Sequence, residues 1–427
     1  MINKLLIFII VLCPIFNKID AQQDVLERIN SNLSLLIKDT SLLVHLGVSD
    51  TSVIIYKNEM DKINNKPEFV LNFTQIEHFL KHSRNQDQFL DIHNLMMLQN
   101  INSRNENNQI LNDQKQKVKI AIDPGHFAHN FKVATYERRY IKAEFPRKLN
   151  KKRFFYEANL THKTAEILKT KLEKEGFEVL LTREKNKSAF GVNYKQWFSK
   201  KKEEKLNKDY LFGQIDSAKL VSLQNAPIND KDLIKYFTIQ ELKERARIIN
   251  EFNPDITVVI HYNVGRKLKE NGFADLHQDN YCMAFIGGSY VKNELLTEKD
   301  RILFLRQLVS KDILKSKELS KSIIKAHQSI CQIRTVNEKD SLTYLTKYSI
   351  ETDHQGVYAR NLFLTRNIYG PICYGESLLQ DNYDEALELS KSYFLNKKSS
   401  NYRLLQVANA YFSGIVECLN NRASLVD

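Results

Sequence analysis

The stretch Val118-Lys119-Ile120-Ala121-Ile122-Asp123-Pro124-Gly125-His126 joins a short β-prone run to an abrupt turn that ends in a histidine. An apolar run of this length, followed at once by turn residues, is typical of a strand that is buried on both faces. Pro124 fixes one backbone angle, and Gly125 permits a close approach or a positive φ. We therefore predict a buried strand that places His126 at the rim of a sheet.

Strands and helices alternate along the chain on the C-terminal side of this stretch. The pattern predicts helices over about 156–175, 241–252, 318–328 and 402–419, and strands over 178–182, 256–261, 282–286, 360–364 and 371–376. Apolar strands separated by helices are typical of an α/β fold, with a mostly parallel twisted sheet and helices on both faces. Ligands of such folds lie outside the carboxyl ends of the strands.

Composition divides the chain into three parts. Residues 1–21 have the features of a signal peptide, with Lys4 before an apolar run and Ala21 at the cut; a retained N-terminal anchor is the alternative. Residues 22–117 are polar and Asn-rich. This composition predicts a small α+β module or an extended arm followed by a linker, and the function of this part is unknown. Residues 118–427 form the expected catalytic domain, with long insertions at about 184–236, where no clear pattern emerges, and at about 287–316.

The overall composition restricts the class of protein and its partners. Of the 427 residues 42% are hydrophobic, so a packed core is expected and disorder of the whole chain is not. A net charge of +12 favours anionic surfaces, but no zinc-finger or RNA-binding signature points to nucleic acid. Without a stable membrane span after signal cleavage, the protein is expected in the periplasm or cell envelope. The remaining cysteines leave one or two disulfides open: Cys282, Cys331, Cys373 and Cys418.

Four polar side chains stand where a ligand of this fold would lie. His126 follows a predicted strand across a tight turn, His261 ends another strand, and Glu376 ends the strand that begins at Pro371. Glu157 begins a helix and shares the face of its apolar stripe, where an unpaired carboxylate is costly. Taken singly, each has an ordinary alternative: a surface histidine, a core histidine, a helix-dipole glutamate, and a glutamate paired with Arg360 or Arg366.

Together, these residues suggest a metal centre. Two imidazoles and one carboxylate, here His126, His261 and Glu157, are the ligand set of a catalytic zinc site that keeps a fourth position open for water. Bound zinc lowers the pKa of that water and polarises a carbonyl oxygen. A buried Glu376 would have a raised pKa, which suits a general base near neutral pH.

The same segments resemble those of the zinc-dependent N-acetylmuramoyl-L-alanine amidases (amidase type 3). The strand followed by Asp-Pro-Gly-His is matched by residues 120–126. The glutamate at the head of a helix, with Gly and Leu-Thr-Arg downstream, is matched by Glu157, Gly176 and residues 181–183. The unit that ends in a Ser-Ile-His-Ala-Asn-like motif is matched by residues 242–263, and the late strand with its glutamate by residues 371–382.

The resemblance implies that His126, Glu157 and His261 bind zinc and that Glu376 is the catalytic carboxylate. The substrate would be the amide between the lactyl group of muramic acid and L-alanine in peptidoglycan. Three departures concern the neighbours of these residues: Phe127-Ala128 replace Gly-Gly, Tyr262 replaces a small residue, and Ser377-Leu378-Leu379 follow Glu376.

Several alternatives stay open. In regulated members of this family an inserted helix blocks the zinc until an activator protein moves it, and residues 184–236 or 287–316 are candidates; plain surface elaboration is the other interpretation. A zinc hydrolase of another amide and a non-enzymatic wall-binding protein are competing functions. His129 and His162 are additional histidines near the motifs, and helical spacing turns His162 away from Glu157.

Overall fold

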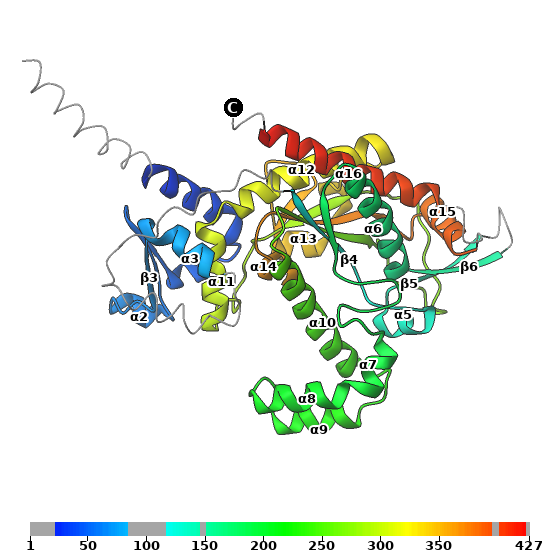
Figure 1. Ribbon diagram of the computed structural model, residues 1–427, viewed down its shortest axis with the longest axis horizontal. Coiled ribbons are helices and arrows are strands. Elements are labelled where there is room, and N and C mark those ends of the chain that lie inside the picture. The colour runs from blue at the N-terminus through cyan, green and yellow to red at the C-terminus, as the bar shows by residue number, and fades with distance from the viewer. Residues whose placement is uncertain (1–21, 84–116, 146–150, 395–400, 424–427) are drawn as a thin grey trace, which may run out of the picture.

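The computed structural model describes residues 22–83, 117–145, 151–394 and 401–423. Its centre is a seven-stranded sheet with the strand order β10-β11-β9-β12-β8-β4-β7 (Figure 1). The pairs β12–β8, β8–β4, β4–β7 and β9–β11 are parallel, whereas β12–β9 and β10–β11 are antiparallel. The strands span Lys119–Pro124 (β4), Glu178–Leu181 (β7), Ile256–Asn263 (β8), Met283–Ile286 (β9), Ser349–Glu351 (β10), Val357–Arg360 (β11) and Ile372–Leu379 (β12).

Helices cover both faces of this sheet. One face packs against α6 (Glu157–Lys174), α12 (Asp312–Cys331) and α16 (Tyr402–Ala423). The other face packs against α10 (Lys231–Phe252) and α14 (Phe363–Asn367). Because both faces are covered, β8 is almost wholly buried, as its apolar sequence predicts. The predicted fold class, a mostly parallel α/β sheet with helices on both faces, is confirmed.

The register of the central strands brings their carboxyl ends to one edge. Pro124 of β4 lies opposite Ile260 of β8, and His261 of β8 lies opposite Glu376 of β12. The polar residues that end these three strands therefore share the rim at which ligands of parallel sheets bind.

The N-terminal residues form a small α+β unit that packs against the main domain. Residues 22–36 are helical. Three antiparallel strands follow, with short helices between them. These elements are η1 (Thr40–His45), β1 (Leu46–Val48), β2 (Ser52–Ile55), α2 (Glu59–Ile63), β3 (Phe69–Asn72), η2 (Phe73–Gln75) and α3 (Ile76–His82). The buried Asn32 donates to the carbonyls of Gln307, Leu308 and Ser310, which fixes the first helix against the end of α11 (Glu298–Val309).

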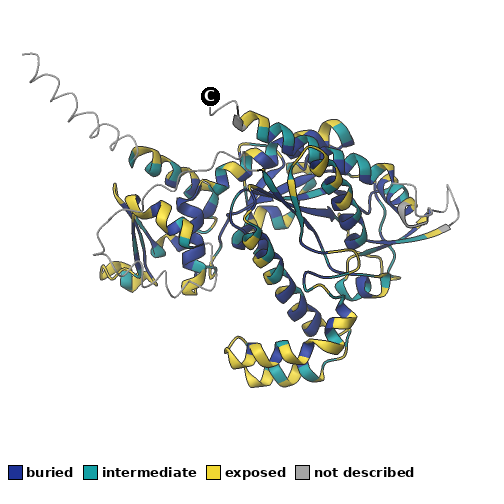
Figure 2. Ribbon diagram, in the orientation of Figure 1, coloured by how far each residue is buried: buried dark blue, intermediate teal, exposed yellow. Residues whose placement is uncertain are grey.

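Helix α11 occupies much of the predicted insertion at 287–316. Every residue from Arg301 to Val309 is buried, and Arg301 forms an ion pair with Glu68 of the N-terminal unit. The helix thus lies between this unit and the main domain (Figures 1 and 2). The segment gives the N-terminal unit its docking surface.

The expectation that residues 184–236 lack a clear pattern is wrong. They contain α7 (Tyr194–Lys200), α8 (Lys202–Leu211), α9 (Ser217–Asn225) and the first turns of α10. Side chains of Asn193, Asp216 and Asp230 cap α7, α9 and α10, and these are typical N-cap residues. The helices α8 and α9 form a projecting, largely exposed hairpin (Figure 2). Because each helix buries only a narrow apolar stripe among many lysines, its helical pattern is hard to recognise in the sequence.

One further expectation needs correction, and the question of disulfides, which the sequence left open, is answered. The strand predicted over 360–364 ends at Arg360, and α14 begins at Phe363. The turn between them is closed by Thr365, whose hydroxyl donates to the carbonyl of Arg360 and accepts the N–H of Leu362. The four cysteines named above form no disulfide and are all buried as free thiols.

Two elements flank the site edge. Helix α5 (Phe131–Glu137) leads into the hairpin of β5 (Tyr140–Phe145) and β6 (Lys151–Tyr156), which precedes α6. The helices α13 (Thr343–Tyr348) and α15 (Tyr383–Phe394) complete the structure, with the single turn η4 (Glu338–Asp340).

Within the described residues, none of the helices combines the length and apolar character needed to cross a membrane. The predicted signal peptide at 1–21 lies outside the described residues.

Candidate functional site

His126 stands on a tight turn at the carboxyl end of β4. Its backbone adopts φ 65°, in the left-handed region that is uncommon for residues other than glycine. Gly125 is required for a different reason, because a Cβ at this position would lie 2.3 Å from Cε1 of His261. The Pro-Gly-His turn therefore lets the two imidazoles approach, with ring centroids 4.8 Å apart.

Two buried arginines hold the carbonyl groups of this turn. Arg245 on α10 donates to the carbonyl oxygens of Pro124 and His126, at 2.7 Å each. Its guanidinium also pairs with Asp123 and Glu241. Arg183, just after β7, donates to the carbonyls of Pro124 and Gly125. Both arginines belong to the motif segments, and their role here is to fix the backbone beside His126.

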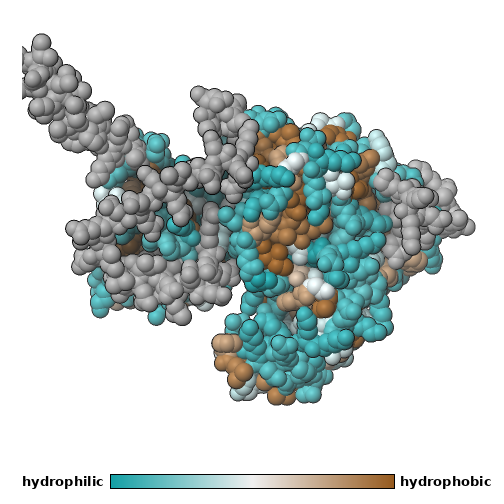
Figure 3. Space-filling model, in the orientation of Figure 1, coloured by the Kyte–Doolittle hydropathy of each residue, from teal (hydrophilic) through white to brown (hydrophobic). Residues whose placement is uncertain are grey.

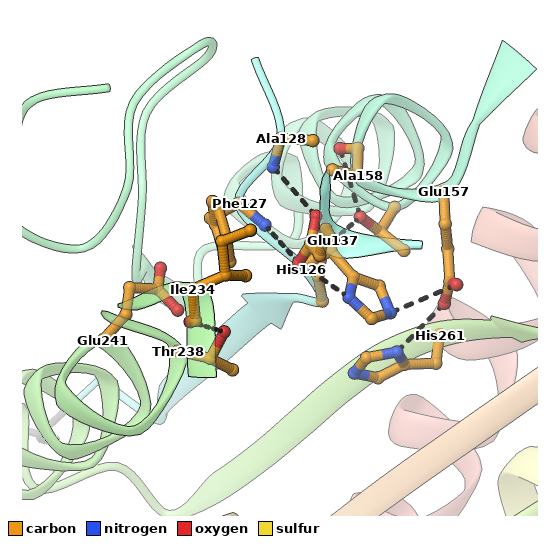
Figure 4. Close-up of polar contacts among 12 residues, drawn as sticks. His126, Phe127, Ala128, Glu137, Glu157, Ala158, Ile234, Thr238, Glu241 and His261 are labelled. Carbon is orange, nitrogen blue, oxygen red and sulfur yellow. Dashed lines mark hydrogen bonds and ion pairs between the residues drawn. The ribbon is translucent and has the colours of Figure 1, made fainter. Parts of the chain in front are cut away.

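Glu157 lies between the two histidines (Figure 4). Its Oε2 is 3.1 Å from Nε2 of His126, and its Oε1 is 3.0 Å from Nδ1 of His261. Oε1 also accepts the backbone N–H of Tyr262 at 3.1 Å. Leu160, Thr164, Leu168 and Leu172 on the same helix are buried, so Glu157 lies on the sheet-facing side of α6, as the spacing predicts.

The side chains of the cluster shift one another's pKa values. Burial opposes the charged imidazolium of His126, but the carboxylates of Glu157 and Glu137 outweigh it and raise its pKa to about 9. Burial lowers the pKa of His261. Burial also disfavours the ionised form of Glu157, yet the two histidines hold its pKa well below the usual value. A carboxylate between two imidazoles is thus the favoured state.

Glu137, at the end of α5, is a site residue that the sequence reasoning missed. Its Oε1 is 3.0 Å from Nδ1 of His126 and accepts the N–H of Phe127, and its Oε2 accepts the N–H of Ala128 (Figure 4). A metal-binding histidine usually donates its other ring N–H to such a carboxylate. No spacing rule leads from His126 to Glu137, because the contact depends on how α5 folds back over the turn.

Glu376 lies beside this cluster on β12, opposite His261 in the parallel register. Its Oε2 is buried and has no hydrogen-bond partner among the described residues. Burial, together with the charge of Glu157, raises the pKa of Glu376 to about 8. The ordinary alternative is not observed among the described residues: neither Arg360 nor Arg366 forms an ion pair with Glu376, and Arg366 pairs with Asp300 instead.

The departures from the family pattern point away from the cluster. Phe127 packs on Phe237 and Tyr194, with centroid distances of 4.7 and 5.7 Å, and so anchors α10 and α7 to the turn. The hydroxyl of Tyr262 bonds to that of Thr164 inside the α6 face, at 2.6 Å. Leu378 and Leu379 are buried. These larger residues fill the core around the site.

Among the described residues, the other two histidines are not members of the group that could hold a metal ion. His162 is buried on α6, with its Nδ1 3.3 Å from Oε2 of Glu166. His129 is two residues beyond Phe127, and burial lowers its pKa.

His126, Glu157 and His261 each offer a ligand atom within 4.8 Å of the others, and they form a group that could hold a metal ion. Two nitrogens and one carboxylate oxygen suit zinc, and the carboxylate of Glu137 orients the His126 ring. The fold and site therefore define an α/β protein with a candidate catalytic metal centre at the carboxyl edge of its sheet.

Residues 120–403 match the family model described as N-acetylmuramoyl-L-alanine amidase, and the chain belongs to that family of peptidoglycan amidases. The motifs that carry the resemblance in the sequence lie inside this range. Comparison with curated protein sequences gives no match.

Similar solved structures include three amidases. The CwlD amidase from Clostridioides difficile, solved in complex with the GerS lipoprotein, is 16% identical, with 71% of this chain and 99% of that chain covered and a TM-score of 0.38. Ami1 from Mycobacterium abscessus is 14% identical, with 71% and 98% covered and a TM-score of 0.37. AmiC2 of Nostoc punctiforme is 13% identical, with 71% and 98% covered and a TM-score of 0.36.

Proposed function

We propose that this protein is a zinc-dependent hydrolase of the amide between N-acetylmuramic acid and L-alanine in peptidoglycan. In this proposal His126, Glu157 and His261 hold the zinc ion, and Glu376 is the catalytic carboxylate. The observation that carries it is the convergence of these three ligand atoms within 4.8 Å of one another, although their residues are up to 135 positions apart in the chain. Membership of the amidase family supports the substrate.

The zinc ion, when bound, would activate a water molecule and polarise the carbonyl oxygen of the amide. Glu137 accepts from Nδ1 of His126 and so presents Nε2 to the centre. The Tyr374 ring stacks on His261 at 4.6 Å and 9°, which fixes the orientation of that imidazole. These contacts hold the ligands in place before substrate arrives, so little reorganisation is needed during the reaction.

Glu376 can transfer a proton from the attacking water to the leaving nitrogen. Burial and the charge of Glu157 raise the pKa of its carboxyl group, which suits a group that takes up a proton and then releases it. As the water oxygen forms a bond to the carbonyl carbon, Glu376 accepts a proton from that water. When the carbon–nitrogen bond breaks, Glu376 returns the proton to the nitrogen, which leaves as the free amine of L-alanine.

The biological setting is part of the proposal. A signal peptide at 1–21 would direct the chain to the periplasm or cell envelope, where peptidoglycan lies, for wall remodelling or cell separation. An activator protein is a candidate partner, since α7, α8 and α9 are inserted beside the catalytic turn. The proposal includes the division of the chain into an N-terminal module and linker at residues 22–117 and a catalytic domain at residues 118–427.

Zinc content and peptidoglycan products test the proposal together. We expect about one zinc ion per purified chain, and mass spectrometry of digested wall should show free L-alanine amino termini on the stem peptides. Glu376→Gln should retain zinc and lose cleavage by at least about 100-fold, the scale of general acid–base catalysis. Digestion at the parent rate by this variant would refute the assignment of Glu376. A zinc-free chain that still digests wall material would refute the metal mechanism.

A further inference from the structure

Arg360, at the end of β11, differs from four other arginines of this protein that are wholly or partly buried. Arg245, Arg301, Arg306 and Arg403 are each ion-paired with a carboxylate. Arg360 has no such partner within the described residues. Its Cζ lies instead over two aromatic rings, 5.1 Å from the centroid of Phe285 and 4.8 Å from that of Tyr344. A half-buried guanidinium held by rings keeps its N–H groups available for an anion.

The rings beneath Arg360 continue to the metal centre. Tyr374 stacks on His261, and the Phe285 ring lies 6.2 Å from that of Tyr374. From the other side, the hydroxyl of Tyr344 accepts from Nδ2 of Asn263, two residues after His261, at 3.4 Å. We call Tyr374, Phe285 and Tyr344 the aromatic shelf; both tyrosines are half-buried, so part of each lies at the surface.

The charge of Arg360 reaches the catalytic carboxylate. Arg360 is among the cations that act to lower the pKa of Glu376, against the larger effects of burial and Glu157. Tyr344 is likewise close enough to Glu376 for that carboxylate to raise its pKa, after burial. Arg360, the shelf and Glu376 therefore border one region beside His261.

The geometry points to Arg360 as the recognition residue for a carboxylate on the peptide side of the cleaved amide. The inference rests on the proposed function and specifies its substrate. In the peptide stem of peptidoglycan, the residue after L-alanine is a D-glutamate joined through its γ-carboxyl, which leaves its α-carboxyl as a free anion or as an amide. A guanidinium pairs with the free anion in a bidentate manner and loses that charge-assisted pair when the group is amidated.

The order of the rings gives the direction of the peptide. The steps from His261 to Tyr374, from Tyr374 to Phe285 and from Phe285 to Arg360 are 4.6, 6.2 and 5.1 Å. In the substrate the α-carboxyl group stands on the carbon that is bonded to the second amide nitrogen, so it lies about two residues' advance, or about 7 Å, from the cleaved amide. A substrate that has its amide at the metal centre and its L-alanine against Tyr374 would thus bring this carboxyl group to the side of Tyr374 on which Arg360 lies.

Paired substrates and matched variants test the inference in the zinc-loaded full chain. The substrates are N-acetylmuramoyl-L-alanyl-D-glutamate and the same compound with D-isoglutamine, which differ only in the α-carboxyl group. We expect Arg360→Gln to raise KM for the carboxylate substrate by about 10-fold to 100-fold, the loss typical of a removed charge-assisted pair. KM for the amide should change little, and any effect of the lost charge on Glu376 should alter kcat equally for the two substrates. The preference for the carboxylate, measured as the ratio of the two kcat/KM values, should therefore fall, and Arg360→Lys should restore part of it.

Lys347→Gln is the control. Lys347 is an exposed cation that also lies over a ring, 5.1 Å from the centroid of Tyr348, so this change removes the same charge from the helix that carries Tyr344. It should leave both substrates unaffected. If Arg360→Gln slows both substrates equally, Arg360 has a structural role only and the inference is wrong. It is also wrong if Arg360→Gln changes neither substrate.

A binding measurement separates this inference from the proposed function. If the parent protein cleaves neither substrate, the proposed function fails. Calorimetric titration with the dipeptides L-alanyl-γ-D-glutamate and L-alanyl-D-isoglutamine then decides the role of Arg360. Preferred binding of the carboxylate form, lost in Arg360→Gln, supports the subsite. Equal or undetectable binding of the two dipeptides overturns it.

Discussion

Oε1 of Glu137 lies 3.0 Å from Nδ1 of His126, and the carboxylate also accepts the backbone N–H groups of the next two residues. One side chain thus fixes both the imidazole and the backbone that follows it. Glycines at positions 127 and 128 would leave this backbone freer, whereas Phe127 and Ala128 are buried and held by Glu137. The departure from the family pattern is therefore accompanied by a carboxylate that orders the turn.

Replacing Glu137 should weaken zinc binding without removing a ligand. In Glu137→Gln the side chain has a single acceptor oxygen for three donors, so at least one N–H loses its partner. We expect the Kd for zinc to rise by about 10-fold to 100-fold, the usual effect of losing an outer carboxylate. Competition with a chromophoric chelator measures this Kd. Glu144→Gln, which disturbs only an exposed ion pair with Lys152, should leave it unchanged. An unchanged Kd in Glu137→Gln would contradict the orienting role.

The sequence predicted the central sheet because its strands are short apolar runs with clear ends. The runs that end at His126, His261 and Glu376 became β4, β8 and β12, and their parallel pairing brings the three residues to one edge. Glu157 was placed correctly because its spacing to Leu160, Thr164 and Leu168 defines one helix face, and all of these are buried. Local periodicity was sufficient wherever one face of an element contacts the core.

The missed features depend on contacts that periodicity does not encode. Glu137 reaches His126 because α5 folds back over the turn, and no repeat in the sequence relates the two. The helices α8 and α9 bury only narrow stripes, such as Leu206 and Leu223, among many charged residues. Leu211 and Phe212 at the end of α8 are even 80% and 71% exposed, and apolar surface is visible at the free end of this hairpin (Figure 3). Hydrophobicity alone would place these two residues in the core, whereas the structure exposes them.

Phe127 should be one of the most costly core positions to truncate. Its ring is 2% exposed and contacts both Phe237 of α10 and Tyr194 of α7. Phe127→Ala is expected to lower the free energy of unfolding by about 3–5 kcal/mol, because it removes a buried ring and leaves a cavity. Phe212→Ala removes the same atoms from an exposed position and should cost less than about 0.5 kcal/mol. Urea denaturation compares the two variants, and equal midpoints would contradict the anchoring role of Phe127.

The stability of the protein should depend on the protonation of His327 in α12. This histidine is 1% exposed; its Nδ1–H donates to the carbonyl of Ile323 at 2.9 Å, and its Nε2 has no partner among the described residues. Burial lowers its pKa to about 4. An unfolded chain, with a histidine pKa of about 6.5, therefore takes up the proton first as the pH falls.

The sign of the effect follows from this difference. Between about pH 6.5 and pH 4 the unfolded state binds more protons, so the free energy of unfolding falls with decreasing pH by up to about 1.4 kcal/mol per unit from this group. Above about pH 7 both states are neutral at His327 and the contribution is constant. His327→Phe keeps a ring against Tyr411 and cannot titrate. The stability difference between parent and variant should thus change over this window and be flat above it; a parallel pair of pH profiles would show that His327 does not contribute.

Gly125 should be irreplaceable because of space rather than backbone conformation. A Cβ at this position would lie 2.3 Å from Cε1 and 2.4 Å from Nε2 of His261, so Gly125→Ala must displace that imidazole or the turn. Since His261 is held by Tyr374 and Glu157, we expect zinc affinity to fall by at least about 10-fold, the scale of effect that a disturbed ligand shell produces.

Gly176→Ala is the control and should give the opposite pattern, because Gly176 has φ 89° and open space around its Cβ position. That change should cost about 1–2 kcal/mol of stability through backbone strain and leave the zinc affinity unaltered. If Gly125→Ala lost stability but kept its zinc affinity, His261 would not be confined by the turn, and its close approach to His126 would have another cause.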